Sequence, residues 1–278
     1  MRSDDIPFAV RLTNGEKWGV TPADLQRLMR LNPRGCFVAH DGIRRVGMTT
    51  TTNYPKKLAW IGNVIVDRKY RGKHIGRALV EHATLHLQRT GLKHIALYCY
   101  DEHVKFYENL GFVRDAPFVR LRRRASKVEH LKEETGFQRP PSMRTLLAAD
   151  QHAFGADRSK LLRDVLADEN AWIVGISYGA SSTSYLMVKE FADECEFGPW
   201  ICIDPLRDVP SKMIDQALSR IGSLPVEIGC LRGNRAAIRI LKRKGFRAIR
   251  EGYRMFLQKR AKIGDDSAQY GLGFLDKG

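Results

Sequence analysis

A basic loop with two glycines, lying between an apolar stretch and a helix-like stretch, is the part of the sequence best suited to chemistry. The apolar stretch ends at Val66, and helical spacing of apolar residues begins soon after the loop. Main-chain N–H groups and the positive end of a helix dipole make such a helix start a site for anions, above all a diphosphate. The residues that we predict to hold the diphosphate are Arg71, Gly72, Lys73, His74, Ile75, Gly76 and Arg77.

The spacing of this loop excludes two common nucleotide sites. It has no Gly-Lys-Ser/Thr ending and no G-x-G-x-x-G pattern, so neither an NTPase phosphate loop nor a dinucleotide-binding turn is expected. His82 and His86 have the i, i+4 spacing of metal ligands, but no H-E-x-x-H frame completes a site. We therefore expect no metal and interpret both histidines as part of a helix face. The five cysteines are scattered without a C-x-x-C pair, which favours buried thiols over zinc ligands or disulfides.

The elements that must position the loop alternate between strands and helices. Residues 58–66 form a long apolar stretch that predicts a strand, and the apolar spacing over 75–89 predicts the helix after the loop. Around them, strands are expected at 35–39, 44–50, 93–99 and 112–121, and helices at 21–31 and 101–109.

The second half of the chain repeats this order of elements. Helices are expected at 161–166, 212–221 and 235–244, and strands at 171–178, 183–190, 226–230 and 246–257. Three short matches follow one another at similar offsets: 60–61 with 200–201, 75–79 with 214–218, and 111–112 with 245–246. Because the matches keep the same order, we interpret the chain as a duplicated unit.

The loop and a second motif together resemble the GNAT superfamily of acyl-CoA N-acyltransferases. The family's loop reads R/Q-x-x-G-x-G/A after an apolar strand, and residues 71–76 read RGKHIG. The departure is His74, where the family usually has its first glycine. The family's second motif, A-x-x-F-Y-x-x-x-G-F, is matched by KFYENLGF at 105–112, without the usual upstream Asn-x-x-Ala. The resemblance covers residues 5–121.

This resemblance implies an α/β (α+β) fold of tandem GNAT-like units, each a mixed, mainly antiparallel sheet flanked by helices. It also implies acetyl-CoA as co-substrate. The strand residues Val64, Ile65 and Val66 would pair with the pantetheine arm, and residues 71–77 would hold the diphosphate. A main-chain N–H near Ile65 or Val66 would polarise the acetyl carbonyl.

By the same resemblance, Tyr107 would be the general acid that protonates the departing CoA thiolate. The alternative, that Tyr107 is only a core aromatic beneath its helix, stays open. The attacking amine must be neutral, so a base or a water chain is needed. The sequence does not identify the base, for which Asp101, Glu102 and His103 are candidates.

In the second half, the positions that align with the cofactor residues carry other side chains. The aligned pairs are Arg71 with Pro210, Gly76 with Asp215, and Tyr107 with Leu241. A proline lacks an amide donor, and a carboxylate at a helix start repels a diphosphate. We therefore expect a degenerate C-terminal GNAT-like domain without a cofactor. Residues 153–158 are expected to form one wall of the acceptor pocket.

These features predict an N-acetyltransferase that moves an acetyl group from acetyl-CoA directly to a primary amine bound in the cleft between the two domains. The expected acceptor is a small-molecule or peptide amine, and its identity stays open, as does the oligomeric state. The alternative is a catalytically silent acyl-CoA-binding sensor or regulatory protein. Residues 232–262, with twelve Lys and Arg and one Glu, suggest a third class that binds nucleic acid. We interpret this run as a solvated face and do not expect nucleic acid as a partner.

Length and composition agree with a two-domain globular chain. The 278 residues carry 47 Lys and Arg against 31 Asp and Glu, and the net charge of +16 fits an anionic partner without identifying it. No stretch predicts a transmembrane helix or a secretory signal, so we expect a cytoplasmic location and no membrane partner. The predicted parts are a domain at 1–124, a linker at 125–142, a domain at 143–262 and a tail at 263–278. The tail is either loosely attached or an arm pinned by Tyr270 and Phe274.

Overall fold

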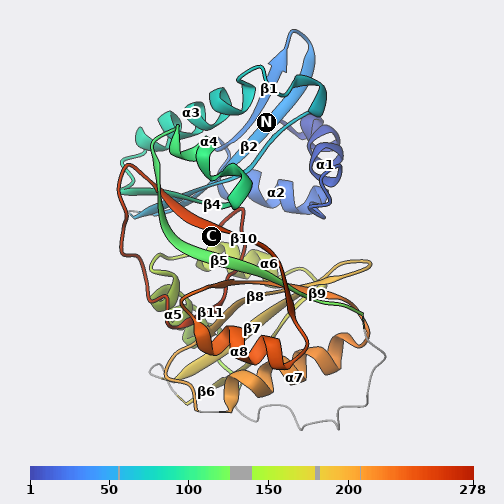
Figure 1. Cartoon of the computed structure of the whole chain (residues 1–278), viewed down its shortest axis with the longest axis vertical. Coiled ribbons are helices and arrows are strands. Elements are labelled where there is room, and N and C mark those ends of the chain that lie inside the picture. The colour runs from blue at the N-terminus through green and yellow to red at the C-terminus, as the bar shows by residue number, and fades with distance from the viewer. Residues whose placement is uncertain (56, 126–139, 179–181, 207) are drawn as a thin grey trace. The chain divides into compact units, whose positions relative to one another are not determined.

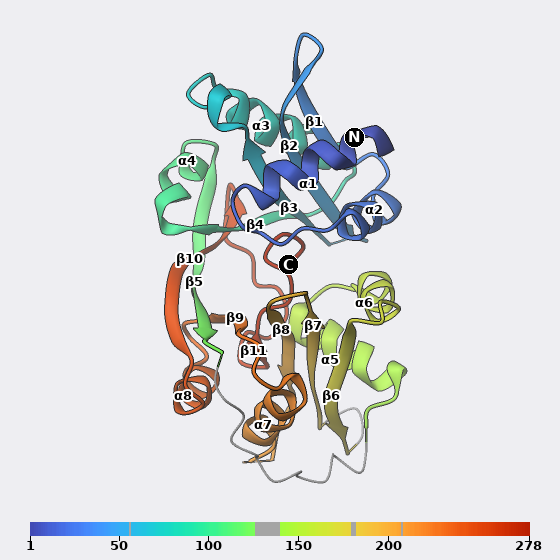
Figure 2. The same cartoon turned by 90° about the vertical axis from the view of Figure 1, so that its right-hand side faces the viewer.

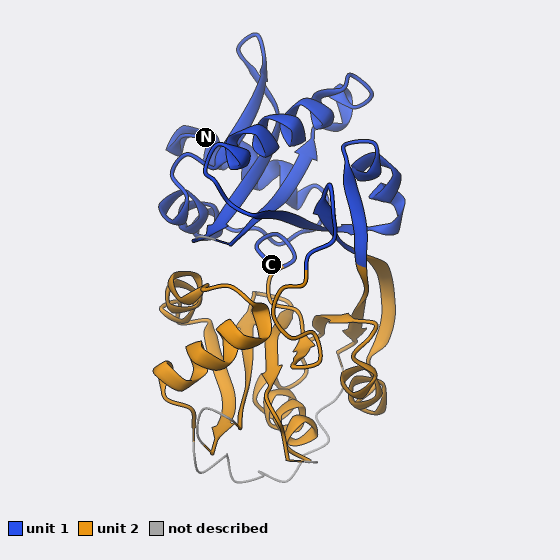
Figure 3. Ribbon diagram, turned by 90° about the vertical axis from the view of Figure 1, so that its left-hand side faces the viewer, with its two compact units in different colours: residues 1–115, 254–261, 275–278 blue, residues 116–253, 262–274 orange. Residues whose placement is uncertain are grey.

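The computed structural model describes residues 1–55, 57–125, 140–178, 182–206 and 208–278 (Figure 1). It divides into two compact units (Figure 3). Unit 1 contains Met1–Asp115, Arg254–Ala261 and Leu275–Gly278, and unit 2 contains Ala116–Tyr253 and Lys262–Phe274. Each unit therefore combines stretches that lie far apart in the sequence. Most of the predicted linker, residues 126–139, lies outside the described residues.

Unit 1 is built on a mixed sheet. Its first four strands are β1 (Cys36–Asp41), β2 (Arg44–Tyr54), β3 (Leu58–Val66) and β4 (His94–Tyr100). Strands β1, β2 and β3 pair antiparallel, and β3 pairs with β4 in parallel. Two further strands, β5 (Phe112–Arg123) and β10 (Arg247–Leu257), have residues in both units, and β10 follows β4 in the strand order. The strands predicted in the first half are thereby confirmed.

Helices cover both faces of the unit 1 sheet (Figure 1). They are α1 (Ile6–Asn14), α2 (Pro22–Leu31), α3 (Ile75–Gln88) and the short α4 (Val104–Glu108). The predicted start of α2 is confirmed, because the Thr21 side chain accepts the N–H of Asp24 and the Asp24 carboxylate accepts the N–H of Thr21 at 3.1 Å. Helices α1 and α2 share an apolar cluster with Met48 and Ile65 of the sheet.

Helix α3 packs on the opposite face from that cluster. The rings of His82 and His86 meet the ring of Phe37 edge-on, with centroids 4.7 and 5.3 Å apart. Burial lowers the pKa of His86 below its ordinary value, so it is neutral around pH 7. The two histidines thus lie on one helix face and contact Phe37, in line with their interpretation from the sequence.

Unit 2 repeats the pairing pattern of unit 1 (Figure 2). Its own strands are β6 (Ala171–Ser177), β7 (Thr183–Glu190), β8 (Cys195–Cys202), β9 (Val226–Leu231) and β11 (Gln269–Gly271). Its helices are α5 (Met143–Phe154), α6 (Ser159–Leu166), α7 (Val209–Ile221) and α8 (Arg235–Arg243). As in unit 1, three strands pair antiparallel and the third pairs in parallel with the fourth. The expected fold class, an α/β fold in which each unit has mixed strand pairing flanked by helices, is confirmed.

The glycine-rich tail is an arm whose residues up to Phe274 belong to unit 2 and whose residues from Leu275 belong to unit 1. Strand β11 pairs antiparallel with β8, and the Tyr270 ring lies 5.0 Å from the ring of Trp200. Phe274 is buried. Of the two possibilities for the tail, the pinned arm is the one observed. Among the described residues, no helix combines the length and the apolar character that a membrane span requires.

Candidate functional site

Strands β3 and β4 part at the centre of unit 1. Among the described residues, their parallel pairing runs from Leu58 and His94 to Trp60 and Ala96. Both strands continue beyond this point, β3 to Val66 and β4 to Tyr100. The predicted Val64–Val66 segment therefore lies on the part of β3 that has separated from β4. Its main-chain groups on that side are not paired with β4, and such groups can bind an extended ligand.

A β-bulge lies in the parted section of β3. Met48 pairs with Ile65 and Thr50 with Gly62, so two residues of β3 stand opposite one residue of β2. One of the two is Asn63, whose φ of +51° lies in the left-handed region. The other is Val64, the first of the three predicted strand residues, so the bulge redirects the backbone at the start of the Val64–Val66 segment.

The predicted diphosphate loop follows β3 directly. A single turn of 3-10 helix (Arg68–Tyr70) leads into residues 71–74, all of them exposed, and α3 begins at Ile75. His74 has a φ of +59°, which explains why the family's usual residue at this position is glycine. Histidine is among the residues that adopt this conformation more often than most. The departure from the motif therefore preserves the backbone path.

The first turn of α3 has main-chain donors that the helix itself does not use. The first N–H groups of any α-helix lack an intrahelical acceptor, and the bond from Ala78 N to His74 O is the first of this helix. Within the described chain, the His74 side chain makes no capping bond to this turn. A Cβ on Gly76 would make only ordinary contacts at 3.7 Å, with Phe106 and Val66. These features fit a diphosphate held by backbone amides.

The basic side chains of the loop are partly occupied by protein groups. Arg71 donates to the Val66 carbonyl at 3.0 Å and to Glu16 at 2.7 Å. Hydrogen bonds from Arg68 and Arg71 hold the pKa of Glu16 below its ordinary value, so this carboxylate is charged at neutral pH. The two remaining basic side chains have weaker contacts, Lys73 over the Tyr70 ring at 5.2 Å and Arg77 with Glu81 at 3.4 Å.

Tyr107 lies on α4, which follows β4 after one turn of 3-10 helix. Its ring is buried and packs edge-on against Phe106 and Phe112, with centroids 5.0 and 5.9 Å away. Burial, and to a lesser degree the nearby Cys99 on β4, raise the pKa of Tyr107 far above its ordinary value. The phenol therefore stays protonated and remains a donor over the whole range in which proteins work. Tyr107 can therefore pack in the core through its ring and also donate a hydrogen bond through its hydroxyl.

The three candidate bases lie together but are not distinguished by their surroundings. Asp101, Glu102 and His103 form the exposed 3-10 turn between β4 and α4. Among the described residues, no group of three or more His, Cys, Asp or Glu side chains is arranged to hold a metal ion.

Two residues beside the parted strands were not found from the sequence. Asn63 sits at the bulge, and the Gly-Asn pair that interrupts the apolar run of β3 is a signal that could have indicated it. Asp276 reaches Asn63 from 213 positions away, with 2.9 Å between Asn63 Nδ2 and Asp276 Oδ2. No local pattern in the sequence indicates such a contact.

Unit 2 has a comparable parting of strands, but its own chain occupies the gap. The parallel pairing of β8 and β9 ends at Phe197 and Ile228. Beyond that point β11 pairs with β8, and Leu272 donates its N–H to the Gly229 carbonyl of β9 at 2.7 Å. A Cβ on Gly198 would lie 1.9 Å from the Leu272 carbonyl oxygen. The arm is therefore wedged between the two strands of unit 2.

The other differences of unit 2 are confirmed only in part. Pro210 lies in the first turn of α7, as expected. The expected carboxylate at the start of this helix is wrong, because α7 begins at Val209 and Asp215 lies in its middle, paired with Lys244 at 2.6 Å. The alignment set Ile75, the first residue of α3, over Ile214, the sixth residue of α7, so it did not follow the helix starts. Leu241, aligned with Tyr107, is fully buried.

Side chains of the 153–158 stretch are used inside unit 2. Arg158 is buried and donates to both oxygens of Asp150 at 2.8 Å, and its guanidinium stacks on Phe154 at 4.2 Å. The Tyr185 hydroxyl donates to the same carboxylate. A role for this stretch at an acceptor pocket stays a prediction.

Comparison with known proteins identifies both halves. Sequence profiles described as acetyltransferase (GNAT) domain match residues 32–114 and 146–271. A mycothiol acetyltransferase of Geodermatophilus obscurus is 32% identical over 123 residues, 41% of this chain and 36% of that protein. An uncharacterized N-acetyltransferase of Bacillus subtilis is 29% identical over 177 residues, 62% of this chain and 61% of that protein. The chain thus spans less than two thirds of the length of these curated relatives.

A solved structure extends the likeness to the whole chain. A candidate acetyltransferase from Pyrococcus horikoshii superimposes with a TM-score of 0.81 over 100% of this chain and 94% of its own, at 21% identity. At that identity the likeness concerns the fold. The family assignment comes from the two matched profiles, which together span about three quarters of the sequence. The chain belongs to the GNAT superfamily of acetyltransferases, with one GNAT domain in each half.

Proposed function

We propose that unit 1 binds acetyl-CoA and that the chain transfers the acetyl group directly to a primary amine. The proposal rests on three features of unit 1, taken in the order in which the parts of acetyl-CoA would meet them. The α3 start follows β3 after the loop, the strands part beyond Trp60, and Tyr107 follows the end of β4. In acetyl-CoA the diphosphate would meet the first of these features, the pantetheine arm the second, and the thioester sulfur the third.

The loop residues 71–77 bind the diphosphate in this proposal. Gly72 has a φ of +80°, and no heavy atom lies within 4 Å of the place of a Cβ. A diphosphate can therefore approach the main-chain N–H groups of the loop. The exposed Lys73 and Arg77 add positive charge. Arg71 contributes in full only when its guanidinium leaves Glu16, so Glu16 weakens the site in the free protein.

The parted edge of β3 orients the pantetheine arm and the acetyl group. Val64, Ile65 and Val66 offer alternating N–H and C=O groups to an extended chain, as a β-strand does to its neighbour. An N–H of this segment that points at the acetyl oxygen stabilises the negative charge that develops when an amine attacks. Acetyl-CoA supplies the acetyl group as a thioester, and the amine supplies the nucleophile.

Tyr107 donates to the departing sulfur. A thiol has an ordinary pKa of about 8.5, whereas the pKa of Tyr107 is raised well above that of a free phenol. Complete proton transfer from the phenol to the thiolate is therefore uphill. Tyr107 acts chiefly by donating a hydrogen bond that stabilises the thiolate, and the proton lost by the amine restores the thiol.

Unit 2 does not take a second acetyl-CoA in this proposal. Its strand gap is filled by β11 and Leu272, the first turn of α7 contains Pro210, and Leu241 stands where unit 1 has Tyr107. The binding place of the amine with respect to the two units stays a prediction from the sequence.

Titration calorimetry with acetyl-CoA, followed by a thiol-release assay over a library of amines, tests the proposal. We expect binding, and CoA release that depends on the amine. Binding without release for every amine would favour the alternative, an acyl-CoA-binding regulatory protein. Absence of binding would refute both.

A further inference from the structure

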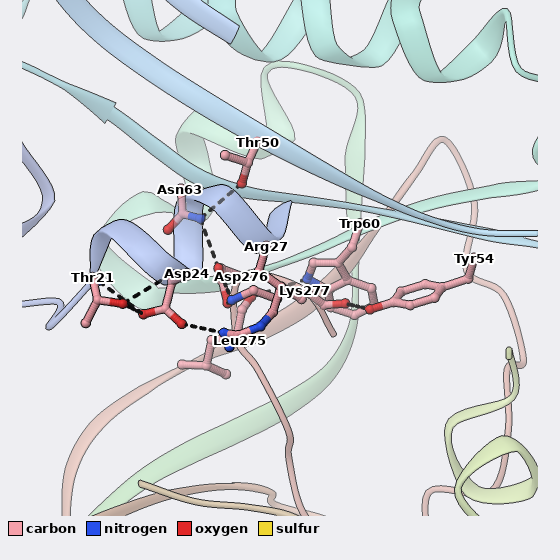
Figure 4. Close-up of polar contacts among 10 residues, drawn as sticks. All are labelled: Thr21, Asp24, Arg27, Thr50, Tyr54, Trp60, Asn63, Leu275, Asp276 and Lys277. Atoms are coloured by element: carbon pink, nitrogen blue, oxygen red, sulfur yellow. Dashed lines mark hydrogen bonds and ion pairs between the residues drawn. The ribbon is translucent and has the colours of Figure 1, made fainter. Parts of the chain in front are cut away.

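Residues 275–278 lie against the β2–β3 face of unit 1 (Figure 4). Trp60 donates its Nε1–H to the carbonyl of Leu275 at 3.3 Å. The hydroxyl of Tyr54 donates to the carbonyl of Lys277, and both Tyr54 and Lys277 are buried. Main-chain groups of this segment are thus fixed by side chains that come from two strands.

The segment approaches β3 most closely at Gly62. A Cβ on Gly62 would lie 2.1 Å from the carbonyl oxygen of Asp276, so only glycine leaves room for it. Gly62 is the residue before the bulge, and Asp276 therefore sits beside the place where β3 changes direction. Both oxygens of its carboxylate also accept from the ammonium of Lys277, at 2.8 and 2.6 Å.

The side chain of Asn63 connects this carboxylate to the sheet. Its Nδ2 donates to Thr50 Oγ1 on β2 at 3.0 Å and to Asp276 Oδ2 at 2.9 Å (Figure 4). Asn63 holds a left-handed backbone conformation, which is unfavourable for a residue with a side chain and persists where neighbouring groups enforce it. The two hydrogen bonds are such a constraint, because they fix the buried amide from both sides.

We propose that Asp276 is a positioning residue of the acetyl site: by holding Asn63, it fixes the bulge from which the main-chain N–H groups of β3 on the side away from β2 take their direction. The inference rests on the proposed function of this edge of β3. It assigns a role to a residue that is remote in sequence from the loop and from Tyr107.

The competing role for Asp276 is direct contact with the acceptor amine. The two roles differ in what Asn63 does. A positioning residue acts through Asn63, so replacing Asn63 by glycine, which adopts positive φ freely, makes the loss of Asp276 redundant. A residue that binds the amine keeps its full effect in the Asn63→Gly background.

The test uses four variants of the full chain. They are Lys277→Met, Asp276→Ala with Lys277→Met, Asn63→Gly, and the combination of all three substitutions. Lys277→Met is the matched control, because it keeps the bond from Asn63 to Asp276. Pairing Asp276→Ala with Lys277→Met avoids leaving a buried ammonium without its partner. Circular dichroism and thermal unfolding confirm that each variant is folded.

The first readout is the ratio of the affinities for acetyl-CoA and CoA, measured by calorimetry. It needs no acceptor, so it does not depend on whether the transfer reaction is found. We expect wild type and Lys277→Met to favour acetyl-CoA, because only acetyl-CoA has the carbonyl that the β3 N–H contacts. We expect the Asp276→Ala pair to lose this preference. An equal ratio in all proteins would overturn the inference.

The second readout is kcat and KM for thiol release. We expect the Asp276→Ala pair to lower kcat by about 10-fold or more, since a misdirected oxyanion donor loses much of its effect, with little change in the KM of the amine. The triple combination should be no slower than the slower of Asn63→Gly and the Asp276→Ala pair. Losses that multiply, or a rise confined to the amine KM, would show direct acceptor binding and overturn the positioning role.

Discussion

Gly111 and Gly245 adopt the same left-handed backbone conformation, each with a φ of +85°. Gly111 ends the α4 segment before β5, and Gly245 ends α8 before β10. The residue four positions before the glycine is Tyr107 in unit 1 and Leu241 in unit 2, and both are buried. The two units thus share one scaffold, in which a hydroxyl is present at one position and absent at the other.

Replacing Tyr107 by phenylalanine tests the role of that hydroxyl. The ring contacts with Phe106 and Phe112 remain, so the fold should be retained. We expect kcat for thiol release to fall by about 100-fold or more, as removal of one preorganised donor to a developing negative charge does. The affinity for acetyl-CoA by calorimetry should stay within about threefold. The matched control is Tyr178→Phe, at a tyrosine of unit 2 that is 48% exposed, and an unchanged kcat for Tyr107→Phe would reduce Tyr107 to a packing residue.

The raised pKa of Tyr107 predicts the shape of the pH profile. A phenol whose pKa lies above its ordinary value of 10.0 stays protonated as the pH rises toward that value. The rate should therefore increase with pH as the amine loses its proton and show no decline below about pH 10. Rates of thiol release across this range measure it, with Tyr107→Phe as the comparison. A decline near about pH 9 that disappears in Tyr107→Phe would mean that the phenol ionises there.

Charge at the first turn of α3 should control acetyl-CoA affinity. Gly76→Asp adds a carboxylate where the diphosphate is expected, and we predict at least about 10-fold weaker binding. Gly76→Ala is the steric control, because a Cβ there contacts Phe106 and Val66 only at 3.7 Å. Calorimetry at two salt concentrations measures both variants, and salt should reduce the difference between them. Equal affinities would place the diphosphate elsewhere.

The arm in unit 2 predicts one acetyl-CoA per chain. Tyr270→Ala removes the ring that packs on Trp200 and should lower the free energy of unfolding by about 2 kcal/mol, while calorimetry still shows a single site. Tyr178→Ala, at a tyrosine that is 48% exposed in the same unit, should change stability little. A second binding event in the Tyr270→Ala variant would show that unit 2 retains a cofactor site.

Features of the site that depend on local sequence could be predicted. The loop, the helix after it and the short helix with Tyr107 follow from glycine placement, apolar spacing and capping residues within a few positions of each other. The first helix, α1, was not predicted, although Ile6, Ala9 and Thr13 have the spacing of one buried face. Pro7 in its first turn is also typical of a helix start.

Features that join distant segments could not be predicted. The bulge at Asn63 depends on pairing with β2, and its partner Asp276 comes from the other end of the sequence. The last residues of β10 belong to unit 1, and this placement depends on contacts such as the one between Arg254 Nε and Asp115 Oδ2 at 2.6 Å. One sequence records which side chains suit burial, but not which distant strand each of them meets.

The division of β10 has a consequence for how the protein is made. The strand beside β4 in the first unit is encoded after nearly all of the second unit, so a growing chain exposes an unpaired β4 edge until that strand leaves the ribosome. The second unit also waits for a late strand, because β11 follows β10 in the sequence and pairs with β8. The two sheets are therefore completed close together in synthesis, rather than one unit after the other.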